Sequence, residues 1–148
     1  MRSLPLFVAA LLVGCAAQGP AYQTPAEPPT GYANLVIYRV PSGPGSAWGT
    51  DFHVDEKKVA DLRIHGYTRV LIKDGEHVVR MGTLRVPVDA KTGTTYFVRY
   101  GSRIASIFMA GPTPIVQGSG LLTLVSPELA VRELVDYRYT EPEVQRVD

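Results

Sequence analysis

The sequence predicts a mainly β protein, a small antiparallel β-sandwich that carries one short C-terminal α-helix. Three observations predict this fold. Short segments rich in β-branched and aromatic residues follow one another from residue 33 onward. Gly, Pro and Asp mark turns between them at short intervals. A helix-start signal near residue 126 then ends the strand pattern. Several short strands with frequent turns favour a sandwich over a parallel α/β fold.

The β-rich region divides into expected strands and turns. Within residues 94–100, alternation places Tyr96, Val98 and Tyr100 on one face and Phe97 and Arg99 on the other. Strands are expected at residues 33–39, 52–55, 58–62, 67–72, 76–80, 83–88, 94–100, 104–109 and 120–125, with tight turns at 56–57, 73–75 and 81–82 and loops at 41–49 and 110–119.

A short helix is expected from Ser126 through Asp136. Ser126 is suited to the N-cap, Pro127 to the first helical position and Glu128 to the positive end of the helix dipole. Two apolar pairs spaced by four residues follow, Ala130 with Leu134 and Val131 with Val135. A helix of about ten residues is marginal alone, so it must pack on the sheet. The domain then spans residues 31–140, and residues 141–148 form a polar, loose tail.

The first 14 residues have the pattern of an export signal. Arg2 supplies a positive charge, and residues 4–13 form an apolar run. Such a run is too short for a membrane-spanning helix, which needs about 20 residues, and it fits the core of a signal peptide. The run ends in Leu12-Val13-Gly14-Cys15, which resembles the bacterial lipobox. This predicts a lipoprotein with Cys15 as its lipidated first mature residue; the alternative is an ordinary secretory signal with a coincidental cysteine.

Residues 15–30 are expected to be the lipidated cysteine and a tether. Residues 16–30 contain four prolines and no apolar periodicity, which predicts an extended, poorly ordered linker with a reach of about 45 Å at most. Ala16, rather than Asp, follows Cys15. In lipoproteins of Gram-negative bacteria, Asp at that place tends to retain the protein in the inner membrane. If the source is Gram-negative, the resemblance therefore implies the periplasmic face of the outer membrane.

Charge and cysteine content exclude some partners and cross-links. The formal net charge is +1, and loss of Arg2 with the signal makes the mature chain about neutral. A neutral domain gives no electrostatic reason to expect a nucleic-acid partner. Cys15 is the only cysteine, so no disulfide within the chain is expected.

The order of segments resembles a known group of bacterial lipoproteins, the family called domain of unknown function 2846. The similarity covers residues 33–139, from ANLVIYR through TTYFVRY to SPELAVRELVDYRY. Its most specific part is residues 54–77, with Gly66-Tyr67 and Asp74-Gly75-Glu76-His77. The same stretch is similar to PEGA-type surface modules, although Asp55-Glu56 stands where those modules often have Asp-Gly. The resemblance implies a β-sandwich and brings no activity with it.

Three histidines, His53, His65 and His77, are equally spaced. Three imidazoles that converge can bind zinc, but no HxH or HExxH element brings them together. We expect solvent-facing residues at or beside turns, and no metal or cofactor.

Other polar residues give no catalytic pattern. Asp51, Asp55, Asp61 and Asp74 are interpreted as turn and edge residues rather than an acid–base pair. The serines Ser102, Ser106 and Ser119 lack a nucleophile-elbow context. The glycines at 118 and 120 are interpreted as a flexible turn, because no GK[ST] follows them.

Trp48 is the strongest candidate for partner contact, because it lies in a loop rich in Gly, Ser and Pro. The alternative is that Trp48 folds back and caps the sandwich core. Tyr137 and Tyr139, on either side of Arg138, are expected to pack the end of the helix on the sheet.

These observations predict a non-enzymatic, membrane-anchored periplasmic lipoprotein that serves as an envelope interaction or support module. One alternative is a small-ligand or glycan-binding module that uses the loop around Trp48 and the loop after residue 110; a deep apolar pocket would favour it. An enzyme is the other alternative, and it would need a cleft with several perturbed titratable residues.

Overall fold

The structure, a computed structural model, describes residues 17–41, 48–110 and 113–148. It confirms the predicted fold class, with two β-sheets and one short C-terminal helix. The strands are β1 (Tyr32–Arg39), β2 (Thr50–Val54), β3 (Lys57–Leu62), β4 (Gly66–Lys73), β5 (Gly75–Met81), β6 (Leu84–Ala90), β7 (Thr95–Ala110), β8 (Thr113–Val125), β9 (Arg138–Tyr139) and β10 (Arg146–Val147), and the helix is α1 (Pro127–Leu134).

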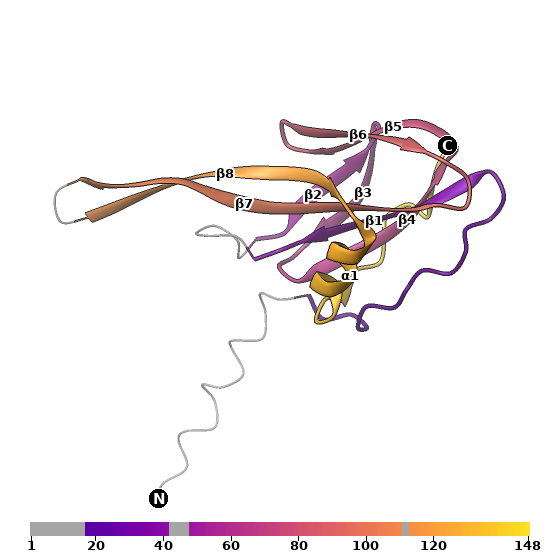
Figure 1. Ribbon diagram of the computed structural model, residues 1–148, viewed down its shortest axis with the longest axis horizontal. Helices are drawn as coiled ribbons and strands as arrows, with labels where there is room; N and C mark the ends of the chain where they lie inside the picture. The colour runs from indigo at the N-terminus through magenta and orange to yellow at the C-terminus, as the bar shows by residue number, and fades with distance from the viewer. Residues whose placement is uncertain (1–16, 42–47, 111–112) are drawn as a thin grey trace, which may run out of the picture.

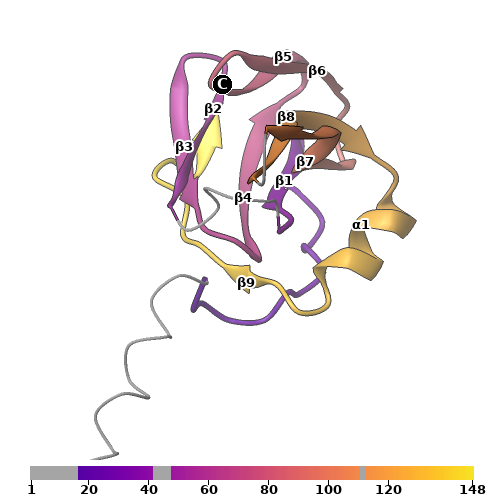
Figure 2. The same ribbon diagram turned by 90° about the vertical axis from the view of Figure 1, so that its left-hand side faces the viewer.

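One sheet has the order β10-β4-β1-β7-β8, with β9 also paired to β4, and the other has the order β3-β2-β5-β6. Strand β1 pairs antiparallel with β4 and parallel with β7. Figure 2 shows the two sheets as separate layers, with α1 outside the sheet that contains β1. The molecule therefore has three layers: the four-stranded sheet, the six-stranded sheet, and an outer cover.

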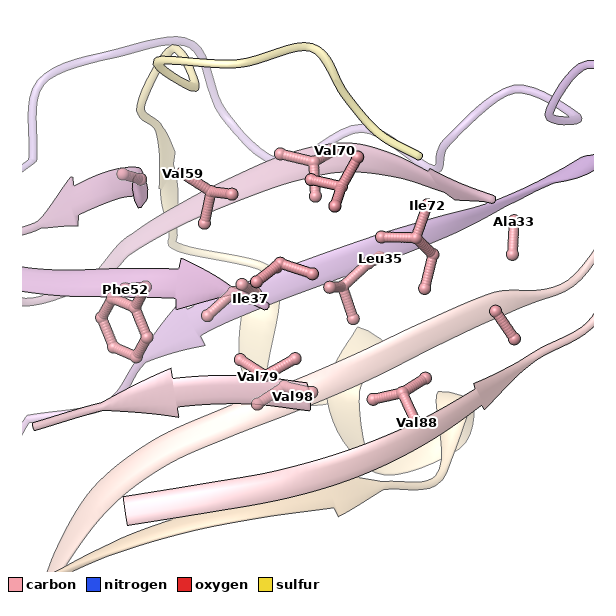
Figure 3. Packing of buried hydrophobic residues seen from close by; sticks show 14 of the residues in the cluster. Ala33, Leu35, Ile37, Phe52, Val59, Val70, Ile72, Val79, Val88 and Val98 are labelled. Atoms are coloured by element: carbon pink, nitrogen blue, oxygen red, sulfur yellow. The ribbon is translucent and has the colours of Figure 1, made fainter. Parts of the chain in front are cut away.

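Strand β1 is buried along both of its faces. Leu35 and Ile37 point into the core between the two sheets, where Figure 3 shows them beside side chains from both layers. Val36 and Tyr38 point the other way, into a second apolar cluster that includes Ala130 of α1 and further residues of the outer cover. Alternation along a strand sends successive side chains to opposite faces, so this strand takes part in both cores.

The tight turn at Asp74 lies within its predicted range of 73–75, and the other two tight turns are displaced by one residue. The β2–β3 turn is at Asp55-Glu56, and the β5–β6 turn is at Gly82-Thr83. Asp55 has φ +54°, in the left-handed region that Asp and Asn adopt more readily than other side chains. This explains how the turn forms without the glycine that PEGA-type modules often have there.

Two expectations about β7 and β8 were wrong. The segments predicted as separate strands at 94–100 and 104–109 form the single strand β7, and most of the predicted 110–119 loop belongs to β8. The two strands pair from Phe97 with Val125 out to Ala110 with Thr113. Glycine and proline suggested a loop, but β8 is an edge strand, and edge strands tolerate both residues.

Gly120, part of the expected flexible turn, is in a strand. A Cβ atom there would lie 3.2 Å from both the Leu84 and the Tyr100 side chains. Gly120 therefore allows β8 to approach these two side chains closely, which accounts for glycine in a paired strand.

The helix begins as predicted and ends slightly earlier, at Leu134. The Ser126 hydroxyl accepts from the Leu129 backbone N–H at 3.4 Å. Ala130 and Leu134 are fully buried on the sheet, whereas Val131 and Val135 are exposed. Glu133 also ties the helix to the sheet: its carboxylate accepts from Tyr38 Oη at 2.6 Å and from Arg99 Nε at 2.9 Å. Burial of the Tyr38 phenol is the main cause that raises its pKa, and the hydrogen bond from Tyr38 to Glu133 is the next.

Two segments expected to be loose are packed. Residues 17–30, which we call the N-terminal strap, run along the outside of the six-stranded sheet, and Pro28 is buried. At the other end, β10 pairs with β4, and Val147 is buried in the inner core. Backbone hydrogen bonds with Ile64, Tyr137 and Tyr139 hold the strap, and backbone pairing with the edge of β4 holds the C-terminal segment. Composition alone did not indicate either attachment.

We predict that Leu134→Asp lowers the free energy of unfolding by about 3 kcal/mol, because it buries a carboxylate without a partner. Chemical denaturation followed by circular dichroism measures the change. The matched control is Val135→Asp, since Val135 is 66% exposed. Equal losses for the two variants would contradict the observed packing of α1.

Candidate functional site

The lipidation candidate, Cys15, lies outside the described residues. The residues that follow it, from Ala17 onward, are bound to the domain surface. The Ala17 backbone N–H donates to the Ile64 carbonyl at 3.3 Å, Tyr139 N–H donates to the Pro20 carbonyl at 2.8 Å, and Tyr22 N–H donates to the Tyr137 carbonyl at 3.1 Å. The strap is thus bound to the β3–β4 turn and to β9 by main-chain hydrogen bonds.

Aromatic rings reinforce this attachment. The Tyr22 ring of the strap meets the Tyr67 ring edge-on at 5.2 Å, and Tyr67 lies 5.4 Å from the Tyr139 ring. Burial raises the pKa of all three phenols. Further along the strap, the Asn34 side chain donates to the Ala26 carbonyl at 2.8 Å. The strap therefore covers part of the outer face of β4 and β1.

Trp48 is 79% exposed, so the alternative in which it caps the core is wrong. Its backbone, however, is held. Arg39 is buried at the end of β1, and its guanidinium donates to the Trp48 carbonyl and to the Leu62 carbonyl. Burial lowers the pKa of Arg39. The result is an exposed indole on an anchored backbone, while the neighbouring Ser46 and Ala47 lie outside the described residues.

The three histidines do not form a common site. His65 is exposed, in the β3–β4 turn with φ +56°, and its ring packs against Tyr137 at 5.3 Å. His53 is half-buried on β2. Across residues 17–41, 48–110 and 113–148, no three His, Cys, Asp or Glu side chains are grouped in a way that could hold a metal ion.

His77 is buried, which corrects the expectation that it faces solvent. It shares the inner face of β5 with Val79 and lies opposite Val88. Its Nδ1 is 2.8 Å from Asp55 Oδ2, and its Nε2 is 2.7 Å from the Lys73 carbonyl oxygen. Each ring nitrogen of His77 therefore lies within hydrogen-bonding distance of an oxygen acceptor.

Asp55 links the β2–β3 turn to β5. Its Oδ1 accepts from the Val78 N–H at 2.9 Å, while Oδ2 faces His77. This Asp–His contact was missed from sequence, and its only signal was a turn carboxylate and a histidine on the apolar face of a strand. Both groups are engaged in joining a turn to a strand, which is a structural role.

The other candidate carboxylates and hydroxyls lie apart from this contact. Asp51 pairs with Lys58 at 2.8 Å, and Asp61 lies opposite Asp51 on β3. Asp74 Oδ1 accepts from the Thr92 N–H at 3.1 Å, as expected for a turn residue. Ser102, Ser106 and Ser119 are distributed over β7 and β8, where Ser102 and Ser119 are exposed.

Tyr137 and Tyr139 pack as expected. Tyr137 is buried against the Tyr38 ring at 5.7 Å, and burial raises its pKa to about 12. Two hollows lie along the strap. One of 130 Å³ lies beside Tyr67, Arg69 and Tyr139, and one of 300 Å³ lies beside Ala17 and Arg63.

No protein-family model, curated protein or solved structure matches the chain. Among the described residues, no helix has the length and apolar character needed to cross a membrane.

We predict that Asp55 and His77 stabilise the fold cooperatively. A double-mutant cycle with Asp55→Ala and His77→Ala should give a coupling energy of about 1–3 kcal/mol in denaturation experiments, because the two side chains contact each other and His77 is buried. The control cycle uses Lys91 and Asp89, whose 2.9 Å pair is exposed on both sides and should couple weakly. Strictly additive losses for Asp55 and His77 would contradict the pairing.

Proposed function

We propose that the protein is a non-enzymatic, lipid-anchored lipoprotein of the periplasm that acts as an envelope interaction or support module. In a Gram-negative cell it resides on the periplasmic face of the outer membrane. Kinship with the domain of unknown function 2846 lipoproteins is part of this proposal. The anchor is the lipid on Cys15, and Trp48 contacts the partner.

The exposed indole of Trp48 is the observation that carries the interaction role. A large apolar ring that is 79% exposed gains free energy when a partner covers it. Its backbone carbonyl is held by the buried Arg39 guanidinium, which reduces the ordering cost of binding. Aromatic residues with such preorganised backbones are typical centres of protein interfaces.

The hairpin arm supports the same role. We use this name for residues 102–110 of β7 and 113–119 of β8, which extend beyond β1. Figure 1 shows the two strands running out together past the other strands. The parallel pairing of β7 with β1 ends at Tyr100, and among the described strands β8 pairs with β7 alone. Open edges of this kind accept an added strand.

The small-ligand or glycan-binding alternative rests on the same tryptophan, because an indole can also stack on a sugar ring. We favour a macromolecular partner over a small ligand, because the open strand edges of the hairpin arm suit an added peptide strand rather than a sugar.

We predict that Cys15→Ser leaves an unprocessed precursor and abolishes metabolic palmitate labelling, since the thiol that carries the lipid is missing. Labelled cells followed by immunoprecipitation measure this. Trp48→Ala serves as the control and should be labelled normally. Palmitate in the Cys15→Ser protein would refute the anchor.

We predict that Trp48 is a contact residue and not a stability residue. As the only tryptophan, it should fluoresce with red-shifted emission, and Trp48→Ala should change the free energy of unfolding by less than about 0.5 kcal/mol. A photo-crosslinking amino acid at position 48 should yield a specific adduct in cells, whereas one at the exposed position 135 should not. Blue-shifted emission with a loss of about 3–5 kcal/mol on Trp48→Ala would instead show a core residue.

A further inference from the structure

The N-terminal strap shortens the link between the proposed lipid anchor and the domain. Ala17 is hydrogen-bonded to Ile64 in the β3–β4 turn. Cys15 precedes it by two residues, and each residue spans at most about 3.6 Å, so the two Cα atoms lie within about 7 Å of each other. A flexible tether over residues 16–30 would instead reach about 45 Å. A lipid on Cys15 would therefore hold this end of the sandwich directly at the bilayer.

Two glycines show how closely the strap fits. A Cβ atom at Gly19 would lie 1.8 Å from the Tyr139 carbonyl oxygen, so no other residue fits there without moving the strap. At Gly66, a Cβ atom would lie 2.8 Å from the Arg63 carbonyl oxygen and 3.4 Å from the Ala17 Cβ. The close backbone approach at Gly19 indicates a specific seat for the strap, whereas the tight contact at Gly66 is with Arg63 of its own turn and Ala17 is in van der Waals contact.

The surface around Ala17 carries groups that suit lipid headgroups. Arg63, His65 and Arg138, which we call the basic rim, are all exposed. Their backbones are joined, because the Arg138 N–H donates to the His65 carbonyl at 2.8 Å and the Gly66 N–H donates to the Arg63 carbonyl at 3.0 Å. Asp61 also lines this end of the molecule. Arginine forks bind phosphate oxygens in a bidentate manner.

A second basic surface competes for the same role. On the four-stranded sheet, Lys58, His53, Arg80 and Arg85 lie opposite one another in register. Figures 1 and 2 both place β5 and β6 on the opposite side of the molecule from the start of the described chain. Because the proposed anchor lies at the start of the chain, it favours the basic rim as the surface that faces the membrane.

We propose that the docked strap orients the domain on the membrane, with the β3–β4 turn and β9 against the bilayer and the arginines of the basic rim on the phosphate groups of its lipids. This inference rests on the proposed lipid anchor. In this orientation β5 and β6 face away from the bilayer.

Nitroxide labels on the full lipidated chain test this orientation. One label is placed by Asp61→Cys, at an exposed position that lines the same end of the molecule as Arg63, and its control by Arg85→Cys, while lipidation blocks the Cys15 thiol. The protein is reconstituted into vesicles of phosphatidylethanolamine and phosphatidylglycerol that contain a nickel-chelating lipid. Headgroup nickel should enhance relaxation of the label at position 61 several-fold more than at position 85.

Release of the strap should remove this difference. Gly19→Val forces the strap away from Tyr139, and Tyr22→Ala provides a second release variant by removing the ring that packs on Tyr67. Thr24→Val, at an exposed strap position, is the control and should keep the difference. Thermal unfolding identifies any variant that fails to fold, in which case the other release variant decides.

The outcomes separate the orientation from the anchor. A purified chain whose mass lacks the lipid would refute the anchor and this inference with it. A lipidated chain with equal relaxation at positions 61 and 85, or with stronger relaxation at position 85, would refute the orientation alone. If label relaxation still differs between the two labelled positions in both release variants, the strap does not set the orientation.

Discussion

Burial of β1 on both faces is the constraint on which the rest of the structure depends. All eight residues from Ala33 to Val40 are buried, and the strand lies between β4 and β7 in its sheet. An antiparallel sheet with one solvated face would expose every second side chain. Here the inner face needs the four-stranded sheet, and the outer face, with Val36 and Tyr38, needs a separate cover.

That cover is assembled from segments at both ends of the chain. Helix α1 supplies Ala130 and Leu134, the C-terminal region supplies Tyr137, and the strap supplies Tyr22. None of these segments is long enough to be stable alone. Their stability comes from the apolar face of β1 and its neighbours, which explains why a proline-rich segment is held in place.

The end of β1 also connects the core to the proposed contact residue. Arg39 follows the inner-face residues of β1, and its buried guanidinium donates to carbonyls at Trp48 and Leu62. A buried cation requires such acceptors. The same interaction that satisfies Arg39 fixes the backbone of the exposed tryptophan, so packing of the core and presentation of Trp48 depend on one side chain.

Local patterns in the sequence determined the fold class, most strand positions, the start of α1 and the division of β7 into two faces. Each of these depends on residues close together in the chain: alternation places Val98 inward and Phe97 outward, and Ser126-Pro127 begins the helix. The lipobox at Cys15 is likewise a contiguous motif, and its use is a proposal drawn from sequence.

Only the tertiary structure decided what depends on contacts between distant segments. The strap has the composition of a loose linker, yet main-chain bonds to β9 and the β3–β4 turn hold it. His77 looked like a turn residue until its register placed it opposite Val88 and beside Asp55. The loop composition around Trp48 allowed either a contact residue or a core cap, and only the structure shows an exposed indole. Composition describes a residue's neighbours in the chain, whereas burial depends on neighbours in space.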